Sequence, residues 1–262
     1  MDAACFFTPD NPSRTGGIMR IAVISDIHGN ATALREVLRD IDDSAVDHTY
    51  CLGDSIGYGP EPEAVIRILL ERSIPSVTGN HELALKDPDF LVWFNPAARQ
   101  SLEKTMAALS DRSRNYLANL PDYISACNCR FVHGFPPDSP TNYLFEMDPA
   151  DMVRILSEMT ERICFIGHTH EPAILAYKEG GIERLPVGGE RVFTLDPGLS
   201  YVVNAGSVGQ PRDGSCPAKY VVYDRDSENI EIRHVAYDVS DTVRKIREAG
   251  LPGKHAMRLL CS

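Results

Sequence analysis

Short apolar runs alternate with amphipathic stretches over the first third of the chain. The largely apolar run 20–25 predicts a buried strand, and residues 30–41 carry apolar side chains at helical spacing. The same alternation continues with strands at 47–52 and 74–77 and a helix at 61–71. Strands that alternate with helices in this way indicate a parallel sheet built from right-handed βαβ units.

From residue 82 to residue 120 the pattern is mostly helical, most clearly at 97–109 and 111–120. Two more helices are predicted at 149–162 and 239–249, and strands dominate after residue 170. The further predicted strands are 124–126, 130–133, 163–166, 173–177, 191–194, 201–204, 219–223 and 230–235.

The chain shows neither an internal repeat nor a linker long enough to divide it, so we predict a single domain over 19–262 with two sheets and helices outside them. Residues 1–18 contain proline, asparagine, serine and glycine without an apolar period, and we expect them to be a disordered N-terminal extension. Because Met19 directly precedes the first strand, a translation start at Met19 is an alternative interpretation.

Five short polar motifs follow predicted strands, each at the point where the strand ends. They are Asp26-Ile27-His28, Gly53-Asp54, Gly79-Asn80-His81-Glu82, Val132-His133-Gly134 and Gly167-His168-Thr169-His170. Taken singly, a motif such as Gly-Asp is a common turn. Ligands of open α/β sheets bind at the carboxyl ends of strands, so five such motifs in order favour a metal site.

These motifs supply two aspartates, one asparagine and four histidines as candidate ligands for two metal ions. The candidates are Asp26, His28, Asp54, Asn80, His133, His168 and His170. Imidazole and carboxylate ligands together suit Mn²⁺, Fe, Zn²⁺ or Ni²⁺ better than Ca²⁺ or Mg²⁺. Two divalent ions with two aspartates and a bridging hydroxide keep about one positive charge, which attracts a phosphate oxyanion. His81 is then free to act as a general acid or to stabilise charge on the leaving oxygen.

On these five motifs the chain, from about 19 to 235, resembles the calcineurin-like metallophosphoesterase superfamily. The resemblance implies an α/β fold, a four-layer αββα sandwich of two mixed β-sheets flanked by helices. It implies that His81 is the catalytic histidine. It also implies two ligand sets, namely Asp26, His28, Asp54 and His170 for one metal and Asp54, Asn80, His133 and His168 for the other.

Three further segments, 53–60, 94–96 and 204–212, look like the bacterial branch of small phosphodiesterases and diadenosine tetraphosphatases. In the last segment a strand ends in a glycine-rich turn, so we expect Gly206, Ser207 and Arg212 to contact the phosphate of the substrate. The chain departs from the protein phosphatases of the superfamily, which place an aspartate three residues after the Gly-Asp aspartate.

That position is Gly57 here, which leaves His81 without its usual partner and weakens a protein phosphatase interpretation. We therefore predict a phosphodiesterase that uses two metal ions, most active with manganese, and a metal-activated hydroxide to cleave a small nucleotide-type phosphoester. The alternatives are hydrolysis of a dinucleoside polyphosphate such as diadenosine tetraphosphate, a phosphomonoesterase or protein phosphatase, and a non-catalytic scaffold with this fold.

Charge and cysteine usage narrow the partners and the compartment. The net charge of −11 disfavours binding to duplex nucleic acid or to anionic membranes, and no apolar run approaches a membrane span. The seven cysteines are scattered and the N-terminus lacks the pattern of a signal peptide, so we predict the reducing cytoplasm and no disulfide framework. A small phosphorylated substrate is the expected partner, and the sequence leaves oligomerisation open.

Overall fold

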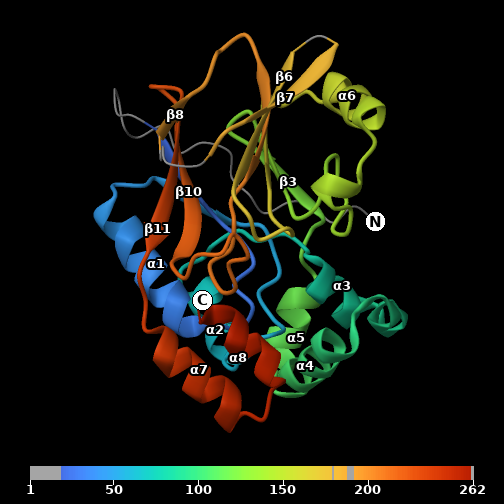
Figure 1. The fold of residues 1–262 in the computed structure, drawn as a ribbon, viewed down its shortest axis with the longest axis vertical. Coiled ribbons are helices and arrows are strands. Elements are labelled where there is room, and N and C mark those ends of the chain that lie inside the picture. Colours follow the sequence, from blue (N-terminus) through green and yellow to red (C-terminus); the bar gives the residue numbers. More distant parts are fainter. Residues whose placement is uncertain (1–18, 179, 188–191, 261–262) are drawn as a thin grey trace.

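The computed structural model describes residues 19–178, 180–187 and 192–260, and the predicted extension 1–18 lies outside these residues. The chain folds into two mixed β-sheets flanked by helices (Figure 1), which confirms the predicted fold class. The strands are β1 (Arg20–Ile24), β2 (His48–Cys51), β3 (Tyr123–Ala126), β4 (Cys129–Val132), β5 (Ile163–Ile166), β6 (Ala173–Lys178), β7 (Gly181–Leu185), β8 (Val192–Thr194), β9 (Ser200–Asn204), β10 (Ala218–Asp224) and β11 (Asn229–Val235).

The helices are α1 (Ala31–Asp43), α2 (Pro62–Glu71), α3 (Asn80–Lys86), η1 (Pro88–Trp93), α4 (Pro96–Ala107), α5 (Asp111–Ala118), η2 (Leu144–Glu146), α6 (Pro149–Glu158), α7 (Val239–Glu248) and α8 (Gly253–Leu259). Strand β7 and helix α8 were not predicted. Helix α8 has only seven residues, too few for a clear apolar period. The predicted helix 149–162 ends at Glu158, because Met159 adopts an extended backbone.

One sheet has the strand order β2-β1-β10-β11-β8, and the other has the order β3-β4-β5-β9-β6-β7. The predicted parallel pairing holds for β1 and β2, but the other neighbour of β1 is β10, which runs antiparallel. The predicted strand 74–77 is reduced to a single bridge between Cys51 and Ser76. Pro75 in its middle has no N–H to donate to a longer ladder.

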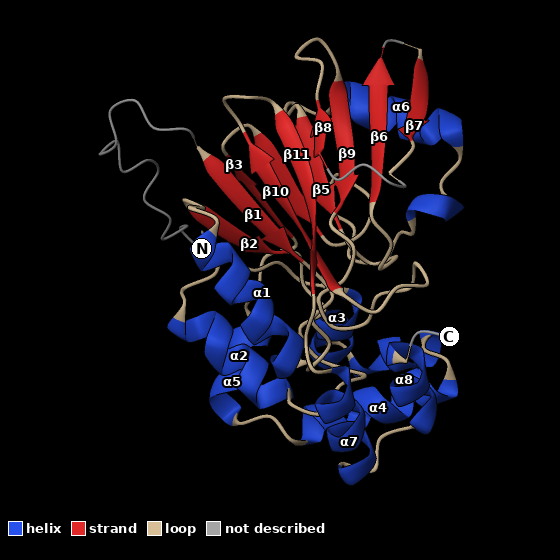
Figure 2. Cartoon of the chain, turned by 60° about the vertical axis from the view of Figure 1, so that its left-hand side comes forward, coloured by secondary structure: helices blue, strands red, loops and turns tan. Residues whose placement is uncertain are grey.

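The side chains of β1 are buried on both faces of its sheet, and their two sets of neighbours define the layers of the fold. Ala22 and Ile24 pack with α1 and α2, whereas Ile21 and Val23 pack against the second sheet. Beyond the second sheet, Leu156 of α6 packs in a third cluster with β4 and β5. The order is therefore helices, sheet, sheet, helix, and Figure 2 shows the remaining helices gathered beyond one end of the strands.

Two observations bear on the predicted compartment. No helix within the described part of the chain is long and apolar enough to cross a membrane. Cys51, Cys129 and Cys164 are free, but Cys216 is disulfide-bonded, which departs from the expectation of reduced cysteines at that position.

Candidate metal centre

The predicted ligands gather where the carboxyl ends of strands from both sheets meet. Asp26 lies two residues beyond the end of β1, and Asp54 follows β2. His133 and His168 follow β4 and β5 of the other sheet, and Asn80 begins α3. The structure therefore brings together side chains as far apart in the sequence as those of Asp26 and His170.

The backbone at these strand ends is strained. Positive φ angles occur at Asp26 (52°), His28 (47°), Asp54 (51°), His168 (67°) and His170 (63°). Such angles cost roughly 1–3 kcal/mol each outside glycine and cluster at functional sites. Their concentration in the candidate ligands indicates that the fold holds these side chains for chemistry rather than for stability.

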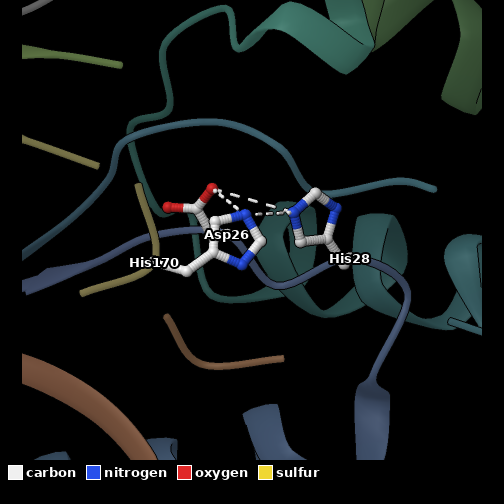
Figure 3. Close-up of side chains that lie close together, drawn as sticks. All are labelled: Asp26, His28 and His170. Atoms are coloured by element: carbon white, nitrogen blue, oxygen red, sulfur yellow. Dashed lines mark hydrogen bonds and ion pairs between the residues drawn. The ribbon is translucent and has the colours of Figure 1, made fainter. Parts of the chain in front are cut away.

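Asp26, His28 and His170 form the first cluster (Figure 3). The Nε2 atom of His170 lies 3.2 Å from Nε2 of His28 and 3.2 Å from Oδ1 of Asp26. The other carboxylate oxygen of Asp26 accepts hydrogen bonds from Ser25 Oγ (2.6 Å) and from the backbone N–H of His168 (3.1 Å). Oδ1 is buried without a hydrogen-bond partner, as expected of an oxygen that is oriented to coordinate a cation.

Backbone carbonyls fix the tautomers of this cluster. His28 Nδ1 lies 2.9 Å from the carbonyl oxygen of Ile56, and His170 Nδ1 lies 2.7 Å from that of Gln210. A carbonyl can only accept, so each neutral ring carries its proton on Nδ1 and presents a lone pair on Nε2. Two lone pairs facing each other cannot form a hydrogen bond, but they fit a metal ion held by carbonyl-oriented imidazoles.

The second cluster follows the same logic. His133 Nδ1 donates to the carbonyl of Leu52 (2.8 Å) and His168 Nε2 donates to that of Thr141 (3.1 Å). Their remaining nitrogens lie 3.1 Å apart, and His133 Nε2 is also 3.1 Å from the amide oxygen of Asn80. A proton on Nε2 of His133 could be donated to the nitrogen of His168 or to the amide oxygen of Asn80, but not to both. One metal ion could bind all three atoms together.

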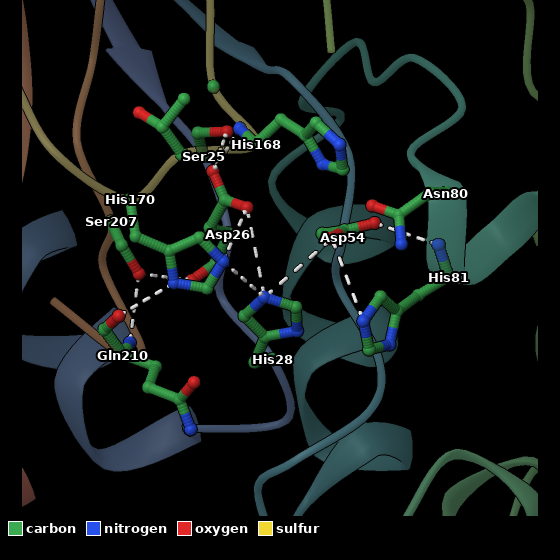
Figure 4. A network of polar contacts seen from close by, with 12 residues as sticks. Ser25, Asp26, His28, Asp54, Asn80, His81, His168, His170, Ser207 and Gln210 are labelled. Atoms are coloured by element: carbon green, nitrogen blue, oxygen red, sulfur yellow. Dashed lines mark hydrogen bonds and ion pairs between the residues drawn. The ribbon is translucent and has the colours of Figure 1, made fainter. Parts of the chain in front are cut away.

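Asp54 lies between the two clusters (Figure 4). Its Oδ2 atom is 3.4 Å from His133 Nε2 and 3.7 Å from His28 Nε2, so one carboxylate reaches both groups. Burial alone would raise the pKa of Asp54, but His133 and His81 hold it well below its usual value. Burial lowers the pKa of His133, and the Asp54 carboxylate outweighs that effect and raises it to about 9. The centre is thus negatively charged and favours cations.

His81 differs from the predicted imidazole ligands because no carbonyl among the described residues orients its ring. Its Nε2 atom is 3.8 Å from Asp54 Oδ2, and its buried Nδ1 has no hydrogen-bond partner. A Cβ atom at Gly57 would lie 2.0 Å from that Nδ1, so the backbone of Gly57 closes the place where a carboxylate partner would be expected. Burial lowers the pKa of His81 to about 3, so the ring is neutral near pH 7.

Glu82 supports the site, a role that the sequence did not disclose. Its fully buried carboxylate accepts the backbone N–H groups of Asp54 (2.8 Å), Ser55 (2.8 Å) and Gly79 (3.0 Å). It therefore ties two ligand loops together and does not replace the missing partner of His81. Its place as the last residue of the Gly-Asn-His-Glu motif was the available signal.

Two of the predicted substrate contacts, Ser207 and Gly206, are buried and form hydrogen bonds with neighbouring loops. Ser207 is fully buried, and its hydroxyl donates to the carbonyl of Asp26 (2.8 Å) and accepts the N–H of Gln210 (2.8 Å). Gly206 is also buried, with φ at 74°, and its N–H donates to the side chain of Asn204 (2.9 Å). This turn holds the loops of Asp26 and Gln210 together through these hydrogen bonds.

Arg212, the third predicted substrate contact, lies at the edge of the site. Its guanidinium carbon is 5.9 Å from the ring centre of Tyr58, and its Nε atom is buried without a partner. Among the described residues no carboxylate forms an ion pair with it. The positive charge of Arg212 is therefore available to an anion.

The C-terminal helix α8 forms part of the wall, which sequence reasoning missed. Tyr58 packs on His28 (4.4 Å between ring centres) and His81 (4.8 Å), and on its other side contacts His255 of α8 (4.8 Å). His255 is buried and its Nε2 lies 3.2 Å from the carbonyl of Ala97. No motif surrounds His255, so only the tertiary structure reveals this contact.

Comparison with known proteins agrees with this geometry. A model described as the calcineurin-like phosphoesterase superfamily domain matches residues 19–228. The chain is similar to the uncharacterized protein MJ0912 of Methanocaldococcus jannaschii, with 33% identity over 237 residues that make up 88% of this chain and 93% of that protein.

Solved structures show the same relationship. The metallophosphoesterase from Sphaerobacter thermophilus is 34% identical, with a TM-score of 0.77 over 94% of this chain and 99% of that one. The hypothetical protein PH1004 from Pyrococcus horikoshii is 19% identical, with a TM-score of 0.74 over 93% and 98% of the two chains, which is a likeness of fold alone.

Proposed function

The chain belongs to the calcineurin-like phosphoesterase superfamily and is a hydrolase of phosphoesters, and from that premise we propose that it is a dinuclear-metal phosphodiesterase acting on a small nucleotide-type phosphoester. The observation that supports this proposal most strongly is the convergence of ring nitrogens in both clusters, with Nε2 of His28 facing Nε2 of His170 and Nε2 of His133 facing Nδ1 of His168. A small substrate fits the net charge of −11, which disfavours a nucleic-acid duplex. We keep the cytoplasm as the proposed compartment.

The residues of the two clusters would divide the metal ions between them. Asp26, His28 and His170 would hold one, Asn80, His133 and His168 the other, and Asp54 both. When bound, two divalent ions supply a hydroxide nucleophile at neutral pH and clamp the attacking and leaving oxygens. Manganese is the ion we expect to support activity best, with iron, zinc or nickel as alternatives, since the ligands mix imidazole and carboxylate.

His81 and Arg212 would act on the substrate itself. The neutral ring of His81 keeps one N–H, which can donate to the oxygen of the leaving group as charge develops there. Arg212 would pair with a phosphate oxygen, because no carboxylate in the described residues occupies its guanidinium. Gly57 argues against a protein phosphatase, because its backbone leaves no room for a carboxylate beside His81.

The test is hydrolysis of bis-p-nitrophenyl phosphate and of p-nitrophenyl phosphate by chelator-stripped protein reloaded with Mn²⁺, Fe²⁺, Zn²⁺ or Ni²⁺. We expect metal-dependent release of nitrophenol, with the diester preferred over the monoester. Two bound metals with release from the monoester alone would establish a monoesterase. Two bound metals with release from neither would favour the scaffold interpretation.

A further inference from the structure

Two tyrosines border the candidate metal centre, and the structure separates their roles. The ring of Tyr58 is enclosed by His28, His81 and His255, and only 8% of the residue is exposed. Tyr58 therefore packs the wall of the site. Tyr143 lies in the loop before η2, is partly exposed, and stacks on His168 at the surface side of the centre.

Tyr143 belongs to a stack of three rings that leads from a candidate ligand to the surface. Its ring lies 3.7 Å from that of His168, at 22°, and 4.9 Å from that of Phe145, at 27°. Phe145 is 71% exposed. A further planar group can therefore stack on the exposed ring of Phe145, at the outer end of this stack.

The segment that carries these rings is tied to the ligand loops. The N–H of Gly134 donates to the carbonyl of Ser139 (2.9 Å), and that of Phe135 donates to the carbonyl of Asn142 (3.0 Å). The carbonyl of Thr141 accepts from His168. The aromatic stack is therefore held at a fixed place relative to the second cluster.

Arg212 supplies the second half of a recognition site. Its guanidinium carbon lies 5.9 Å from the ring centre of Tyr58, which packs on His28 and His81, so the positive charge lies beside the candidate metal centre. A nucleotide has a phosphate and a planar base, and these two features match a free guanidinium and an open aromatic ring.

We infer that the substrate carries a planar aromatic group, such as a nucleobase, which stacks on Phe145 at the outer end of the three-ring stack while its phosphate lies between the two clusters and Arg212. This inference rests on the proposed function, and it assigns substrate selection to the segment 139–146. Stacking of one base contributes about five-fold to a hundred-fold in affinity, so the effect is measurable.

The experiment compares two diesters with the same leaving group, the p-nitrophenyl esters of thymidine 5′-phosphate and of methyl phosphate. We expect the wild type to prefer the nucleoside ester. Phe145→Ala should lower kcat/KM for that ester about ten-fold, mainly through KM, and change the methyl ester less than about two-fold. Phe145→Tyr should restore the preference, and Tyr123→Ala, which removes an exposed aromatic stacked on Arg130, should leave both esters unchanged.

Equal losses for both esters, or a wild type without preference, would overturn the inference. If neither ester is cleaved, the proposed function fails, and binding still decides the aromatic site. Calorimetry on metal-loaded protein would then compare adenosine 5′-monophosphate with inorganic phosphate. Tighter binding of the nucleotide that is lost in Phe145→Ala supports the aromatic site, and equal binding of the two anions contradicts it.

Discussion

The ligand loops and the C-terminal helices α7 and α8 meet at the same site but are built differently. The imidazole and aspartate ligands are oriented by further contacts, such as the carbonyl of Gln210 for His170 and the hydroxyl of Ser25 for Asp26. The helices lie beyond the region 19–228 that the family model matches, and α8 contacts Tyr58 and Gln210 at the site.

This difference predicts that the ligand loops determine metal binding and turnover, whereas α8 determines stability. A change in the ligand loops should remove metal or turnover, because each side chain there is fixed for one purpose. A change in α8 should act on stability, since His255 contacts Tyr58 and the carbonyl of Ala97 but no candidate ligand. The predictions below test that separation, beginning with the largest effect.

Asp54→Ala should have the largest effect. The carboxylate reaches both clusters, so its loss should release metal from each and lower kcat at least about 10³-fold. Elemental analysis of the purified protein alongside turnover of the diester measures both quantities. As a control, Asp40→Asn removes a carboxylate that bonds Arg233 far from the site, and it should keep full metal content. An Asp54→Ala protein with two metals and normal turnover would refute the bridging role.

His81→Ala should reduce turnover without removing metal. The ring lacks the carbonyl contact that orients the other imidazoles, so we expect kcat to fall about 10²-fold to 10³-fold while metal content holds. Turnover per bound metal is the deciding measurement. If metal is lost and turnover per metal stays normal, His81 is a ligand and not a catalytic group.

Glu82→Gln should lower the metal affinity of the site, because Glu82 holds the ligand loops and is not itself a ligand. The amide can no longer accept all three N–H groups, so metal affinity should fall about 10-fold to 100-fold, with kcat at saturating metal within a few-fold of wild type. Metal titrations followed by activity test this. Glu63→Gln, which alters a carboxylate bonded to Ser110, is the matched control. An unchanged titration curve would show that Glu82 does not support the ligand loops.

The sequence predicted the gathering of the ligands because each motif follows a predicted strand, and the carboxyl ends of strands from both sheets meet at the site. Most strands were also predicted, because an apolar run is a local signal in the sequence. The antiparallel insertion of β10 beside β1 was not, because pairing between distant segments leaves no local pattern. The inward orientation of Ser207 and the contact of His255 with Tyr58 were missed because both arise from tertiary packing.

The roles of the gathered residues still depend on the experiments above, and the diadenosine tetraphosphatase-like branch stays a prediction. The strained backbone at Asp26 and Asp54 also escaped the sequence, since neither residue type requires a positive φ. Strain of this kind is stored where the surrounding structure fixes the backbone, and it becomes visible only in the folded chain.

The smallest effect is expected at His255 and depends on pH. Burial lowers its pKa to about 4, against an opposing effect of the Ala97 carbonyl, while an unfolded histidine has a pKa of about 6.5. Between these values the unfolded state binds the additional proton, so stability falls as the pH falls. Urea unfolding at pH 7 and pH 5 should show that the wild type loses about 1–2 kcal/mol more than His255→Gln over this interval. His48→Gln, at an exposed histidine of β2, should behave as wild type. Identical pH dependence in His255→Gln and wild type would mean that α8 does not hold a neutral histidine against the site, and its contact with Tyr58 would then be packing alone.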